Sequence, residues 1–375
     1  MKRCDHTHWL SFGTYGNDTC LLESDRLQTL THQIQDPDTQ QPRLFVLIGN
    51  GSKSQALREL FGIKKRRKFR SKRDAGEIHL HLDPSTIFHS RPILLADSDL
   101  PQQNLRGGVP AADKCHETIR RALPRVGGGL SHDVPDGSTD KIYFHLLLPF
   151  ADVFCFFSAD VGGFRQIARH LAVWLEKVQP STLPRNTRPR VVIVTEKIPP
   201  GAEREKEAKK AFLWLLREET TRDLSEQISD IHVVALLPDR RISPKARYRR
   251  LKERLLNESD EVQNSREINR TLFSVTHFAA LFKYACDHFS QASEEPFDFI
   301  KASRKQNPIA KDLAEHISIF LKRIKSAKEL TEFAAPIIAS SILLDNYPPD
   351  THGKLLSLPN SPPPKIRESN LLASV

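Results

Sequence analysis

Short apolar runs alternate with amphipathic stretches along the first two-thirds of the chain. Nearly continuous apolar runs predict buried strands over 44–48, 92–97, 152–157, 190–195 and 231–237. Residues 77–82 alternate polar and apolar side chains, which predicts a half-exposed edge strand. Helical periodicity follows over 55–61, 164–177 and 203–222. Strands that alternate with helices predict an α/β fold with a mainly parallel sheet and flanking helices.

Beyond about residue 238 the pattern becomes helical alone. Helices are expected over 244–256, 268–289, 308–325 and 327–346. Residues 1–42 show little periodicity and are expected to form a poorly ordered lead-in, while the proline-rich residues 351–375 predict a disordered tail. We therefore expect an α/β domain over 43–238 and an all-helical region over 239–350.

Composition favours a folded, intracellular protein. Of the 375 residues, 39% are hydrophobic and 27% charged, which suits a globular chain with long solvated helices. No apolar run is long enough to cross a bilayer, and the N-terminus lacks the apolar segment of a secretory signal. Five scattered cysteines predict reduced thiols. A cytoplasmic location is the expectation.

The net charge of +10 favours acidic partners, and much of it is local. Residues 64–73 hold eight cations, which predicts an exposed basic loop, and 100–140 are rich in Gly, Pro and Asp, which predicts a flexible insertion. The basic loop could face phosphate, bind nucleic acid or direct the chain to the nucleus. Phe69 is its only aromatic residue, so the stacking surfaces of a nucleic-acid binder are missing and that hypothesis ranks lower.

The segment between the first buried strand and its helix is similar to a phosphate-binding loop. Gly49 and Gly51 would let backbone N–H groups surround a phosphate, Lys53 would contact it, and the hydroxyl of Ser54 would support Mg²⁺. The pattern is incomplete, because Leu47 stands where the first glycine belongs and the loop is about two residues short. The alternative is an ordinary glycine-rich turn between a strand and a helix.

Two further strand ends carry residues that fit a nucleotide site. Asp97 ends an apolar strand, where a carboxylate could hold Mg²⁺ or its water shell together with Ser54. Thr195 and Lys197 follow another strand, at the place where GTPase-like folds read the base. The aspartate that grips guanine is absent, since Ile198 and Pro199 come next, so guanine selectivity is not expected.

Several spaced segments carry a family resemblance. They are FVLIGNGSKSQALRELFG, EIHLHLDPSTIFHSRPILLADSDLP, CHETIRR, LLLPFADVFCFFSADVGGFRQIARHLAVWL and RPRVVIVTEK. Over about 43–350 the chain resembles the GTPase-like or P-loop-like region that precedes the patatin-type phospholipase domain in large filamentous-fungal proteins. The resemblance implies a region that regulates an acyl hydrolase. The Gly-x-Ser-x-Gly nucleophile motif of that hydrolase is absent from this chain, so lipase activity does not carry over.

Residues that could assist hydrolysis are few. Arg120 and Arg121 could steady phosphate charge, but two adjacent arginines on a helix cannot both face one site. The pair Gly162 and Gly163, which follows Asp160, could form a switch-like turn or simply begin a helix. At most a weak P-loop NTPase is expected.

These residues lead to two hypotheses. The first is a regulatory module that binds GTP or ATP with Mg²⁺ through Gly49, Gly51, Lys53, Ser54, Thr195 and Lys197, with Ser54 and Asp97 at the metal. The second is a pseudo-P-loop scaffold that binds no nucleotide. In both, the helices over 244–346 are expected to contact a protein partner.

Overall fold

The computed structural model describes residues 7–15, 18–63, 77–98, 117–123, 138–177, 183–237, 242–291, 295–303 and 312–346. The basic run 64–73, the tail 351–375 and most of 100–140 lie outside the described residues. The chain divides into two compact units, the first ending at Ala302 and the second beginning at Ser303.

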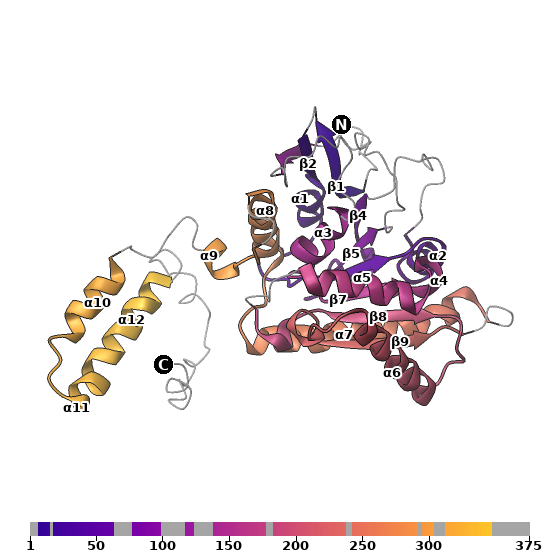
Figure 1. Cartoon of the computed structure of the whole chain (residues 1–375). Helices are drawn as coiled ribbons and strands as arrows, with labels where there is room; N and C mark the ends of the chain where they lie inside the picture. Colours follow the sequence, from indigo (N-terminus) through magenta and orange to yellow (C-terminus); the bar gives the residue numbers. More distant parts are fainter. Residues whose placement is uncertain are drawn as a thin grey trace. The chain divides into compact units, whose positions relative to one another are not determined.

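The first unit is built on one nine-stranded sheet (Figure 1). Its strands are β1 (His8–Tyr15), β2 (Asp18–Ser24), β3 (Arg43–Ile48), β4 (Ile78–Leu82), β5 (Ile93–Ser98), β6 (Thr118–Ala122), β7 (Val153–Phe157), β8 (Arg190–Thr195) and β9 (Asp230–Ala235). They lie in the order β6-β2-β1-β4-β5-β3-β7-β8-β9. The pairings from β5 to β9 are parallel, whereas those from β6 to β5 are antiparallel.

The predicted α/β class is therefore confirmed, but the expectation of a mainly parallel sheet is wrong. Half of the sheet is antiparallel because β1, β2 and β6 extend it beyond β4. For the same reason β4 is an interior strand rather than an edge strand. The expectation of a poorly ordered lead-in over 1–42 also fails in its described part, where Trp9 and Leu10 of β1 are fully buried.

Helices of the first unit, the last of which ends one residue beyond the unit boundary, connect and cover these strands. They are α1 (Arg26–Thr31), α2 (Gly51–Phe61), α3 (Ser138–Lys141), α4 (Ser158–Val161), α5 (Phe164–Lys177), α6 (Ala202–Glu219), α7 (Pro244–Ile268), α8 (Val275–Gln291) and α9 (Phe299–Ser303), together with a π-helical turn over Ile142–Leu147. Helix α2 ends at Gly62, whose left-handed backbone and N–H bond to the Arg58 carbonyl terminate it. Helix α7 begins at Ser243, whose hydroxyl accepts the Ala246 N–H.

Alternate residues of the parallel strands face two separate cores. One face, with Phe45, Leu47 and Val192 at its centre, packs against α2 and α7. The other, with Val46 and Phe154 at its centre, packs against α1, α5, α6, α8 and the π-helical turn. Burial on both faces explains why these strands read as continuous apolar runs.

Helix α7 is anchored to the sheet by a buried ion pair. Arg266 Nη1 donates to Asp152 Oδ1 at 2.7 Å, and Gln263 Nε2 donates to the same carboxylate. Burial raises the pKa of Asp152 and lowers that of Arg266, and each charge offsets this effect on its partner. The helical region predicted over 239–350 is therefore divided, since α7 and α8 belong to the first unit.

The second unit contains α10 (Leu313–Leu321), α11 (Ala327–Glu329), a π-helical turn over Leu330–Ala334, and α12 (Ala335–Asn346). These elements fall within the two helices predicted over 308–325 and 327–346. In the described parts of the chain, no helix is long and apolar enough to span a membrane.

Candidate functional site

The turn after β3 lies where the order of the parallel strands reverses. Strand β3 has β5 on one side and β7 on the other, so the chain leaves β3 in one direction and later returns to its opposite side. Ligands of open α/β sheets bind outside the carboxyl ends of the strands at such a point. Only Gly49 and Asn50 separate the end of β3 from the first residue of α2, Gly51, so the loop is as short as its sequence predicts.

A carboxylate of the protein itself occupies the N–H groups of this loop. Asp160 Oδ2 accepts the backbone N–H groups of Asn50 at 2.7 Å and Lys53 at 3.0 Å, and its Oδ1 accepts that of Ser52 at 3.1 Å. These N–H groups begin α2 and have no partner within the helix. A negative charge at this end is also favoured by the helix dipole. Asp160 therefore takes the position that a phosphate would take in a phosphate-binding loop.

Gly49 makes this approach possible. Its backbone has a φ of +153°, and an added Cβ would lie 2.7 Å from Asp160 Oδ2 and 3.0 Å from Phe157 Cβ. Asp160 itself sits on the single-turn helix α4, directly after β7, and Gly162 and Gly163 follow with φ values of +94° and +93°. Gly162 and Gly163 thus allow the turn that follows the Asp160 carboxylate, and Gly49 allows the loop whose N–H groups bind that carboxylate.

Lys53 is directed into the protein. Its side chain is fully buried, and Nζ lies 2.7 Å from Asp97 Oδ1 and donates to the Ser98 carbonyl at 2.6 Å. His81 Nε2 lies 3.9 Å from the second oxygen of Asp97. The sequence placed Lys53 on phosphate and Asp97 on Mg²⁺. The structure brings the two residues together instead, as an ion pair between α2 and β5.

The two residues expected at Mg²⁺, Ser54 and Asp97, have other partners in this structure. Ser54 Oγ donates to the Asn50 carbonyl at 2.6 Å, and the carboxylate of Asp97 is paired with Lys53. Within the described ranges, no group of three His, Cys, Asp or Glu side chains could hold a metal ion. The expected pair of Ser54 and Asp97 is not assembled around a common point by these contacts.

Thr195 and Lys197 lie at the end of β8, two strands away from β3. Thr195 is buried and its hydroxyl accepts the Lys197 N–H at 3.2 Å, while the Lys197 side chain is exposed. The neighbouring Glu196 pairs with Arg247 of α7 at 2.8 Å. The described contacts link neither Thr195 nor Lys197 to the loop after β3. The Thr195 hydroxyl instead stabilises the turn that follows β8.

Asp160 was missed as a loop residue, because only its neighbours Gly162 and Gly163 drew attention in the sequence. An aspartate just after a fully apolar strand and before two glycines is the signal that could have found it. The hypothesis of a phosphate-steadying role fails for Arg121, which is buried on β6 and donates to Glu23 at 2.6 Å and to Asp287 at 2.8 Å.

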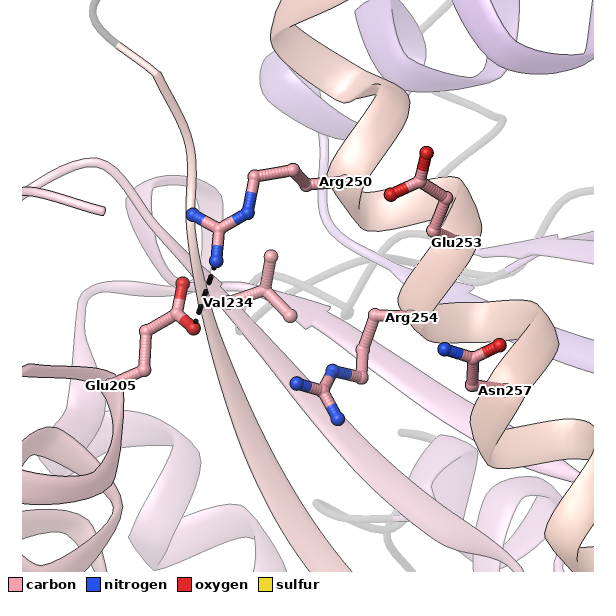
Figure 2. Close-up of a pocket in the computed structure, with 6 residues that line it drawn as sticks. All are labelled: Glu205, Val234, Arg250, Glu253, Arg254 and Asn257. Carbon is pink, nitrogen blue, oxygen red and sulfur yellow. Dashed lines mark hydrogen bonds and ion pairs between the residues drawn. The ribbon is translucent and has the colours of Figure 1, made fainter. Parts of the chain in front are cut away.

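A polar hollow lies elsewhere, between α6, β9 and α7 (Figure 2). Its lining residues are Glu205, Val234, Arg250, Glu253, Arg254 and Asn257. Arg250 donates to Glu205 at 3.2 Å, and Arg254 pairs with Glu258 at 3.1 Å. Because both guanidinium groups already have carboxylate partners, and no loop residue lines the hollow, it does not extend the site at β3.

No protein-family model and no curated protein matches this chain. The candidate site therefore rests on the geometry of the loop.

Proposed function

We propose that this protein is a pseudo-P-loop scaffold that binds no nucleotide and acts in protein interaction through its helices over 244–346. One observation carries the proposal. The three N–H groups of Asn50, Ser52 and Lys53, which a phosphate would need, are all bonded to the Asp160 carboxylate. The chain supplies its own anion.

The surroundings of the loop support the same reading. A nucleotide needs a lysine that reaches the β and γ phosphates and a hydroxyl that reaches Mg²⁺. Lys53 is buried against Asp97, and the hydroxyl of Ser54 is bonded to the Asn50 carbonyl. Binding would require Asp160, Lys53 and Ser54 to exchange their partners. The apparent affinity would then be the intrinsic affinity multiplied by the fraction of molecules in which this exchange has occurred.

The buried pair of Lys53 and Asp97 then has a structural role. The pair links α2 to β5. Asp160 of α4, which follows β7, in turn accepts the backbone N–H of Lys53 and so connects β7 and α4 to the same loop. In a working phosphate-binding loop this lysine would be available to the ligand. Here it instead links α2 to the central strands.

A second candidate is the regulatory nucleotide-binding module, which is favoured by the location of the loop. Its N–H groups converge at the reversal point of the strand order, where open α/β sheets bind ligands. In this candidate Asp160 leaves the loop when GTP or ATP enters, and the glycines after α4 allow the movement.

Thermal unfolding with and without Mg²⁺ and millimolar GTP or ATP distinguishes the two candidates. The scaffold predicts no change in Tm for the wild type with either nucleotide. A saturable rise in Tm, because a ligand that binds only the folded state stabilises it, would favour the regulatory module. Lys53→Ala is the matched control, and the nucleotide-induced shift is compared rather than the absolute Tm.

A further inference from the structure

The second unit has almost no core of its own. Among its described side chains Ala334 alone is buried, although the ring of Phe320 lies 6.3 Å from that of Phe333. The large apolar side chains exposed there are Ile319, Leu321, Leu330, Phe333 and Ile337. Helices of this length gain most of their stability when an apolar face is packed, and the described part of this unit leaves these apolar side chains available for a contact.

Helix α10 carries an ordered stripe of charge on one face. Asp312 is the N-cap residue of α10, Glu315 and Ile319 lie within it, and Lys322 and Arg323 directly follow its last residue, Leu321. The N–H of Lys322 bonds to the Ser318 carbonyl and that of Arg323 to the Phe320 carbonyl, so the helical course continues through this turn. The five residues recur at intervals of three and four, which places them along one side. All five side chains are exposed. The stripe is acidic before Ile319 and basic after it.

This stripe complements itself. Glu315 precedes Ile319 by four residues and Arg323 follows it by four. When two α10 helices cross antiparallel at Ile319, each Glu315 faces the Arg323 of the other copy, and the two Ile319 side chains meet on the two-fold axis. A two-fold interface requires this kind of self-complementary patch, and complementary charges fix its register.

We propose that α10 is the contact surface of a homodimer, in which a second copy of this chain packs antiparallel across Ile319. The inference rests on the proposed function, since it identifies the partner that the helical region binds. Leu330 and Phe333 of the π-helical turn and Ile337 of α12 supply further exposed apolar surface for the same partner.

An anionic membrane fits this surface less well. Lys322 and Arg323 would be attracted to it, but Asp312 and Glu315 lie on the same stripe and would be repelled. In the homodimer both ends of the stripe are used.

Sedimentation velocity of the full chain, at roughly tens of micromolar and low salt, tests the proposal. The wild type is expected to be a dimer and Ile319→Glu a monomer. The matched control is Ile268→Glu, because Ile268 of α7 is 81% exposed in the first unit, and this variant should remain dimeric.

Charge reversal tests the register. Glu315→Arg and Arg323→Glu should each raise the Kd of the dimer about tenfold or more, because like charges then face one another. The double variant restores opposite charges and should return the Kd close to the wild-type value. A dimer that Ile319→Glu leaves intact, or singles that the double variant does not rescue, would overturn the proposed contact.

A wild type that stays monomeric overturns the inference but not the scaffold proposal, which the nucleotide measurement tests separately. Conversely, a saturable nucleotide shift would refute the scaffold while the sedimentation result still decided the dimer. Binding of the monomer to vesicles of anionic phospholipid, with no dimer in solution, would also refute the homodimer.

Discussion

Asp160 Oδ2 accepts the backbone N–H of Lys53 at 3.0 Å, although 107 residues separate the two along the chain. The side chain of Lys53 meanwhile binds a second carboxylate, that of Asp97, at 2.7 Å. Main chain and side chain of the one residue that should face phosphate are thus both held by aspartates of the protein.

Gly49→Ala should destabilise the protein by about 1–3 kcal/mol, because the new Cβ would crowd the Asp160 carboxylate and Phe157 in a backbone region that favours glycine. Gly201→Ala is the matched control, since Gly201 has a similar φ of +159° but a Cβ added there would meet no atom within 4 Å. Urea unfolding gives both values. Equal losses in the two variants would mean that crowding at the loop is unimportant.

Arg266→Met should cost about 3–5 kcal/mol, because it leaves the buried carboxylate of Asp152 without its charged partner. Denaturant unfolding measures the loss. Arg249→Met serves as the control, since Arg249 is 77% exposed beside Glu253 and should change stability by no more than about 0.5 kcal/mol. Addition of Asp152→Asn to Arg266→Met should recover part of the loss; no recovery would contradict a charge effect.

His145 should make stability fall in mild acid. Burial, with smaller effects of Lys141 and His288, lowers its pKa to about 4. The ordinary pKa of histidine is about 6.5. Between about pH 6.5 and about pH 4, His145 is therefore protonated in the unfolded chain but neutral in the folded protein. The folded state is therefore not penalised by His145 above about pH 6.5. As the pH falls toward 4, the free energy of unfolding decreases by up to about 3 kcal/mol.

Unfolding free energies measured from about pH 7 to about pH 4.5 check this dependence. His145→Gln should flatten the profile relative to the wild type. The matched control is His89→Gln, because the His89 side chain is exposed in the same unit and this variant removes no buried imidazole. It should leave the profile unchanged. A wild-type profile that is identical in His145→Gln would refute the assignment.

Truncation should separate the two units. A chain that ends at Ala302 should keep the Tm of the first unit, because that boundary leaves its core intact. A chain that ends before Pro244 should fail to fold, since α7 supplies Tyr248 and Leu251 to the core beside α2 and carries Arg266. Near-ultraviolet circular dichroism distinguishes the outcomes; a cooperative fold in the shorter chain would show that α7 is dispensable.

The central parallel strands could be predicted from the sequence because burial on both faces leaves continuous apolar runs, as in 44–48 and 190–195. Their helices followed from periodicity, and α5 was predicted with its observed bounds. Strands β1 and β2 could not be predicted in the same way. Polar residues such as Ser11 and Glu23 interrupt them, and only tertiary partners explain their burial, as Arg121 does for Glu23.

The candidate loop was located correctly between β3 and α2, but its contacts were not predictable. Sequence spacing identified Lys53 and Ser54 by their chemistry, yet the direction of a side chain depends on which partner the fold brings near. Asp97 comes from β5 and Asp160 from the turn after β7, and both lie far from the loop in sequence. These contacts with Asp97 and Asp160 form because the sheet order places β5 and β7 on either side of β3.

Hydrogen exchange of the backbone amides of Asn50, Ser52 and Lys53 tests the central claim most directly. In the wild type these amides should be protected, because Asp160 accepts all three. In Asp160→Ala they should exchange at least about tenfold faster, while the amides of β3 remain unchanged. Equal exchange in the two proteins would contradict the account, because the loop would then not be held by Asp160.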